Sequence, residues 1–159
     1  MTQILKIAGI FLATMVVQIY LAHYMTIGAV RPDFVLVFLV FISARYGRTW
    51  GILWGFTAGL LQDATGSLSV LGANALAKSV VGYILGTLNG TLAVWTPRVV
   101  NLYIYGTLIG HAVIYQTIMA QGLETAPFIL IGRIFLEAFL SSVFVTGLRL
   151  MIPLVPQQA

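Results

Sequence analysis

The chain has 159 residues, of which 60% are hydrophobic and 8% are charged, and it contains no cysteine. With a mean hydropathy of +1.01, a chain of this length could not bury its apolar surface as a soluble domain, so a multispan membrane protein is predicted. The absence of cysteine excludes disulfides and thiolate metal sites, and the net charge of +4 needs no acidic partner, because basic residues that flank spans account for most of it.

Apolar runs separated by turn residues predict an all-α fold, a single helical-bundle domain over residues 1–159 with about six transmembrane helices and short loops. All five prolines lie at span borders, so no proline-broken helix of the transporter kind is predicted. The second and third spans reach only about 20 Å as helices, against a hydrocarbon core of about 30 Å. Whether they cross the bilayer fully stays open. The predicted spans are Ile4–Tyr24, Asp33–Ala44, Thr49–Leu61, Val70–Leu88, Val99–Ala120 and Phe128–Ile152.

The basic residues predict the orientation of the bundle. If the N-terminus is cytoplasmic, only Arg31 flanks a span on the outer side. Lysine and arginine are enriched in cytoplasmic loops, so we expect both termini in the cytoplasm. The basic residues on the inner side are then Lys6, Arg45, Arg48, Arg98 and Arg149.

The connections between the spans are too short to carry a separate functional domain. The main ones are residues 62–69, 89–98 and 121–127. They leave no room for a nucleotide-binding fold, a soluble catalytic domain or a nucleic-acid module. The sequence also shows no nucleophile–base pair and no cluster of metal ligands. We therefore expect no enzyme, no cofactor, no metal and no nucleic-acid partner.

A ladder of small residues is the most specific feature of the third span. Gly51, Gly55, Gly59 and Asp63 are four residues apart and share one face of a helix. Three glycines on one face let a second helix approach closely in lipid, and a membrane helix keeps a carboxylate only where it is paired or wetted. The ladder predicts either a groove for a partner helix, ending at Asp63, or a packing face within the chain.

Three charged residues are predicted to lie inside the fourth and sixth spans. Lys78 and Glu137 fall at similar depths, about 12 and 14 Å from the outer ends of their spans, which predicts a buried Lys78–Glu137 pair. Arg133 lies one turn above Glu137 and is expected to reach toward Asp63. The alternative is that this cluster contacts a ligand or a partner. His111 is expected to be a hydrogen-bonded core residue.

Several segments resemble one known family. They are Arg31–Leu36 (RPDFVL), Gly51 with Gly55–Asp63 (GFTAGLLQD), Leu71–Leu76 (LGANAL) and Val81–Tyr83 (VGY). Their order and spacing over residues 31–86 resemble the rod shape-determining protein MreD family. Asp33 and the Gly51–Asp63 ladder map onto the family pattern, whereas Lys78, Arg133 and Glu137 belong to no matched signature.

The resemblance implies a non-enzymatic scaffold of the bacterial rod complex, with a fold similar to the membrane substrate-binding component of energy-coupling-factor transporters. It implies a place in the cytoplasmic membrane and a role in peptidoglycan synthesis. The implied partners are an MreC-like bitopic protein, a RodA-like glycosyltransferase with its transpeptidase, membrane lipid and, indirectly, actin-like MreB. We expect the ladder to hold a partner helix and Asp33 to contact the partner at the outer surface. The alternative is a small-molecule or lipid binding subunit of a transporter, because the buried charged cluster could line a polar cavity.

Overall fold

The computed structural model describes residues 2–26, 30–65, 70–91, 94–120 and 126–151. This part of the chain is built from α-helices without strands, which confirms the predicted all-α membrane fold. The helices agree with the predicted spans to within a few residues, and the last residue of the final predicted span, Ile152, lies outside the described residues. The helices are α1 (Thr2–Tyr24), α2 (Phe34–Tyr46), α3 (Arg48–Thr65), α4 (Ala73–Gly86), α5 (Pro97–Ala120) and α6 (Pro127–Met151).

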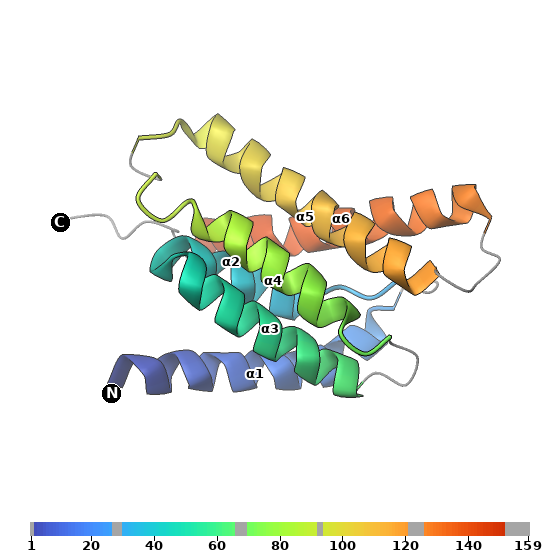
Figure 1. The fold of residues 1–159 in the computed structure, drawn as a ribbon, viewed down its shortest axis with the longest axis horizontal. Coiled ribbons are helices and arrows are strands. Elements are labelled where there is room, and N and C mark those ends of the chain that lie inside the picture. The colour runs from blue at the N-terminus through green and yellow to red at the C-terminus, as the bar shows by residue number, and fades with distance from the viewer. Residues whose placement is uncertain (1, 27–29, 66–69, 92–93, 121–125, 152–159) are drawn as a thin grey trace.

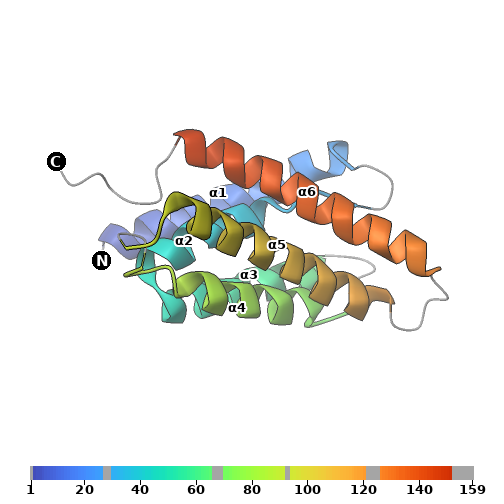
Figure 2. The same cartoon turned by 90° about the horizontal axis from the view of Figure 1, so that it is seen from above.

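Successive helices alternate in direction along the long axis of the molecule (Figure 1). α3 and α4 lie side by side at the front, with α1 along one flank, α5 along the other and α6 at the back (Figures 1 and 2). Seen from above, α5 separates α6 from α4 and α3 (Figure 2). This alternation places the basic residues predicted to be cytoplasmic near one end of the bundle.

The short helix α2 is the centre of the bundle, and it packs against α1, α3, α4 and α6. Its residues from Val35 to Val40 are all buried. It is capped at its C-terminus by Gly47, whose φ of +89° favours glycine and whose N–H donates to Ser43 O at 2.9 Å. Because other helices surround α2, its 13 residues need not match the thickness of a bilayer.

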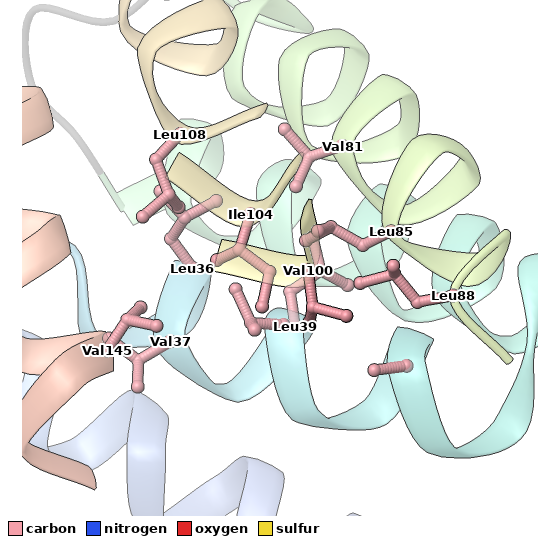
Figure 3. Close-up of a cluster of buried hydrophobic side chains, with 12 residues drawn as sticks. Leu36, Val37, Leu39, Val81, Leu85, Leu88, Val100, Ile104, Leu108 and Val145 are labelled. Carbon is pink, nitrogen blue, oxygen red and sulfur yellow. The ribbon is translucent and has the colours of Figure 1, made fainter. Parts of the chain in front are cut away.

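One buried apolar cluster joins four helices (Figure 3). Leucines on one side of α2 interlock with branched residues of α4 and α5, and α6 adds Val145. Its members drawn and labelled in Figure 3 are Leu36, Val37, Leu39, Val81, Leu85, Leu88, Val100, Ile104, Leu108 and Val145. Burial of this kind fixes which helix faces meet, and it positions the polar side chains that lie between the same helices.

Within the described residues, two helices are long and apolar enough, by length and composition, to cross a membrane. They contain the segments Gln3–Leu21 and Pro127–Met151, each with a mean hydropathy of 2.0. Large apolar side chains on the outside of the bundle, such as Leu102 at 75% exposure and Phe135 at 73%, suit contact with lipid or with another helix. The six-span layout stays a prediction for the other helices.

Candidate functional site

The glycine ladder of α3 packs against α4 of the same chain. A Cβ added at Gly55 would overlap the carbonyl oxygen of Lys78, and one added at Gly59 would overlap that of Asn74. The contact is reciprocal, because a Cβ at Gly82 of α4 would overlap the backbone of Gly51. The groove predicted for a partner helix is therefore filled by α4, and the alternative of packing within the chain is the correct one.

Asp63, the last rung of the ladder, caps the N-terminus of α4. Its Oδ2 accepts hydrogen bonds from the N–H of Gly72 at 2.9 Å and of Ala75 at 3.2 Å. Its Oδ1 accepts from the N–H of Asn74 at 3.2 Å and from Nδ2 of Asn74 at 2.9 Å. The first N–H groups of a helix lack partners within that helix, and a carboxylate there also offsets the helix dipole. Asp63 thus joins the two helices at the outer end predicted for them.

Asp33 caps α2 in the same manner and is buried, with 9% of its surface exposed. Its Oδ1 accepts from the N–H of Leu36 at 3.0 Å, and its Oδ2 lies 2.6 Å from Nζ of Lys78. Gln18 of α1 supports the same helix end, because its Oε1 accepts from the N–H of Phe34 at 2.7 Å. The prediction that Asp33 contacts a partner at the outer surface is corrected, since its carboxylate is engaged inside the bundle.

Lys78 is completely buried. Besides the ion pair with Asp33, its Nζ donates to Oδ1 of Asn74 at 2.9 Å. Asn74 in turn donates to Asp63. A continuous polar chain, Asp33–Lys78–Asn74–Asp63, therefore connects α2, α4 and α3. The two carboxylates of this series, Asp33 and Asp63, are offset by the ammonium of Lys78 and by the N-termini of α2 and α4. Each helix N-terminus is equivalent to roughly half a positive charge.

Glu137 belongs to a second polar group, between α5 and α6. Its Oε2 accepts from Nε2 of Gln116 at 2.6 Å, and its Oε1 lies 3.3 Å from Nδ1 of His111. The His111 ring stacks on Tyr115, with ring centroids 6.1 Å apart.

The predicted Lys78–Glu137 pair is wrong. Lys78 lies on α4 and pairs with Asp33, whereas α6, which carries Glu137, packs mainly on α5 and α2. Arg133 is half-buried and forms no ion pair or hydrogen bond in the part of the chain that the structure describes. The predicted cluster of Lys78, Arg133 and Glu137 is therefore divided, because equal depth does not place residues on facing sides of their helices.

Three amide side chains form buried polar contacts that the sequence analysis did not predict. Gln18 accepts a hydrogen bond from the first turn of α2, Asn74 accepts one from the ammonium of Lys78, and Gln116 donates one to the carboxylate of Glu137. Their signal in the sequence is that each is an amide within an apolar run, where a polar group needs a partner.

A matching protein-family model covers nearly the whole chain. This model, described as rod shape-determining protein MreD, matches residues 1–156. The match extends beyond residues 31–86, whose motifs carry the resemblance, to the first and last helices. The chain matches no curated protein and no solved structure.

Proposed function

The chain belongs to the MreD family, and from this premise we propose that it is a non-enzymatic scaffold of the rod complex in the bacterial cytoplasmic membrane. In this role it docks transmembrane helices of partner proteins and supports peptidoglycan synthesis. The partners that we propose are an MreC-like bitopic protein and a RodA-like glycosyltransferase with its transpeptidase, with actin-like MreB connected indirectly. Family membership supports the involvement in rod shape.

One structural observation carries the scaffold proposal: four inward polar side chains, those of Asp33, Lys78, Gln116 and Glu137, join helices of the chain itself. Asp33 and Lys78 connect α2 to α4, and Gln116 and Glu137 connect α5 to α6. The glycine contact holds α3 against α4. A bundle joined in this way leaves large apolar side chains such as Leu102 and Phe135 on its exterior, and other membrane helices can pack against such a surface.

The same observation weighs against the alternative of a solute-binding subunit. The predicted lining of a polar cavity was the cluster of Lys78, Arg133 and Glu137. Within it, Lys78 is bound by Asp33 and Asn74, and Glu137 is bound by Gln116. A solute would have to replace these partners at the cost of leaving charges unpaired in the bundle interior. This favours a structural role for both groups.

The test is purification of the tagged full chain in mild detergent from its native membranes, together with rescue of cell shape after depletion. We expect MreC-like and RodA-like proteins to be recovered and rod shape to return. The variant Gly55→Leu should force α4 away from α3 and is the control for a misfolded bundle, so it should recover no partner proteins. Recovery of a transporter ATPase or a stoichiometric small molecule, without the rod proteins, would overturn the proposal.

A further inference from the structure

A groove with a volume of about 420 Å³ lies between α4 and α5. Its apolar walls include Val80 and Ile84 of α4 and Leu102 and Ile114 of α5. Leu102 is 75% exposed, so the groove opens on the surface of the bundle. We call it the α4–α5 groove.

The α5 side of the groove contains two glycines that the fold does not use. Gly106 and Gly110 are one helical turn apart, and a Cβ added at either would meet no atom within 4 Å. At Gly55, in contrast, an added Cβ would overlap the backbone of α4. Glycines at this spacing let a second helix approach α5 closely, but internal packing does not account for these two.

His111 also lines the groove, and its unpartnered nitrogens are a second indication that another molecule binds there. The side chain is 1% exposed, and neither ring nitrogen has a hydrogen-bond partner in the described part of the chain. Nδ1 faces Glu137 at 3.3 Å without hydrogen-bond geometry, and Nε2 has no such neighbour. A buried polar atom without a partner is costly, so a polar group that reaches the His111 ring from the groove would remove this cost.

The depth of His111 decides between the possible occupants. It lies about 14 Å from the Ala120 end of α5 and about 21 Å from the Pro97 end at 1.5 Å per residue. A lipid headgroup stays at the bilayer surface, and an acyl chain offers no hydrogen-bonding atom. A side chain of a transmembrane helix reaches this depth. The proposed scaffold function calls for a helix of another protein, and a second copy of the chain is the competing occupant that the crosslinking test distinguishes.

We propose that the α4–α5 groove binds a transmembrane helix of a different protein, which carries a Ser, Thr, Asn or Gln side chain that hydrogen-bonds His111 near the middle of the bilayer. This inference rests on the proposed scaffold function and deepens it, because it identifies the docking face and the chemistry that is recognised. Gly106 and Gly110 allow the close approach, and His111 sets the position of the partner along the groove.

The first test changes the groove without changing the fold. Gly106→Leu and Gly110→Leu should fill the groove and lower recovery of the docked protein about tenfold, equivalent to about 1.4 kcal/mol. Gly9→Leu and Gly132→Leu are matched controls, since an added Cβ meets no atom within 4 Å there either, and they should leave recovery unchanged. Thermal stability of all four variants should stay near that of the wild type.

The second test identifies the occupant in native membranes. A photo-crosslinking amino acid at Leu102 should join a transmembrane segment of another protein, whereas one at the equally exposed Phe135 of α6 should not join that segment. Within the crosslinked segment, one Ser, Thr, Asn or Gln should couple to His111. Changing that partner residue to Ala should weaken docking, and so should His111→Leu. If the two side chains bond each other, docking in the double variant should be no weaker than in either single variant. His111→Gln should retain docking.

The outcomes separate this inference from the proposed function. If the wild type recovers the rod proteins, but Gly106→Leu and Gly110→Leu recover them equally well, the groove assignment is overturned and the scaffold function stands. Crosslinks at Leu102 only to lipid or to a second copy overturn the assignment as well. If the wild type recovers none of the rod proteins, the scaffold function itself fails.

Discussion

Nζ of Lys78 lies 2.6 Å from Oδ2 of Asp33 at the junction of α2 and α4, and the Lys78 side chain is fully buried. The same ammonium bonds Asn74, which bonds Asp63. The two carboxylates that cap α2 and α4 are therefore joined through one cation. The series of polar side chains Asp33–Lys78–Asn74–Asp63 therefore holds α2, α3 and α4 together at one end of the bundle.

Replacing Lys78 by Met should strongly destabilise the protein. The substitution keeps the volume but leaves Asp33 buried without its ion-pair partner, a situation that costs about 3–5 kcal/mol. Thermal unfolding in detergent should detect this loss. Lys6→Met, which removes an exposed lysine of α1, is the matched control and should change stability little. Recovery in the double variant Lys78→Met/Asp33→Asn would show that the unpaired charge is the cause, and an unchanged melting temperature in Lys78→Met would contradict the role of the pair.

Alanine should have opposite effects at two glycines. Gly55→Ala places a Cβ against the carbonyl of Lys78 and should cost about 1–3 kcal/mol by overpacking. Gly106→Ala adds a Cβ in open space and should be neutral or slightly stabilising, because alanine favours helix by about 1 kcal/mol over glycine. Parallel melting curves of the two variants test this. Equal tolerance of both changes would mean that α3 and α4 are not in backbone contact.

Asp63→Ala should loosen the start of α4. It removes the acceptor for three backbone N–H groups, those of Gly72, Asn74 and Ala75, and loss of a helix cap costs about 1–2 kcal/mol. Hydrogen exchange over residues 72–76 should accelerate, while exchange in α5 should not change. Asp63→Asn keeps one acceptor oxygen and should show an intermediate rate. Exchange that stays at the wild-type rate in Asp63→Ala would argue against the cap.

Cysteine labelling should test the orientation, since the chain has no native cysteine. Leu71 and Thr96 are exposed and lie at opposite ends of the bundle. With a cytoplasmic N-terminus, a membrane-impermeant thiol reagent should label Leu71→Cys from the outer side of the cytoplasmic membrane. It should label Thr96→Cys only after that membrane is broken. The reverse pattern would overturn the positive-inside assignment.

The fold class and the helices were predictable because their signals are local. Apolar runs, border prolines and Gly47 mark where helices start and stop. Even the cap at Asp33 has a sequence signal, an Asp directly before an apolar run. The glycine ladder correctly indicated a close helix contact, but it left open which helix fills the groove.

The pairing of the charged residues was not predictable from depth alone. Depth gives the position of a residue along the bundle, whereas a contact also requires that the two helix faces point at each other. Lys78 faces α2 because Leu85 and Val81 of α4 pack into the same apolar cluster as Leu36 and Leu39. That arrangement depends on contacts between side chains far apart in the sequence, and one sequence alone does not show which of them meet.

The α3–α4 contact also bears on how the protein reaches the membrane. Neither helix passes as a span by length and hydropathy, in contrast to α1 and α6, and each carries polar groups that are satisfied by the other. Since they are neighbours in sequence, the contact forms with a short closing loop. We therefore expect the two helices to enter the bilayer as one hairpin. In nascent chains that stop before α4, a cysteine introduced into α3 should react with a thiol reagent from the aqueous phase, whereas in chains that extend past Asn89 it should be protected.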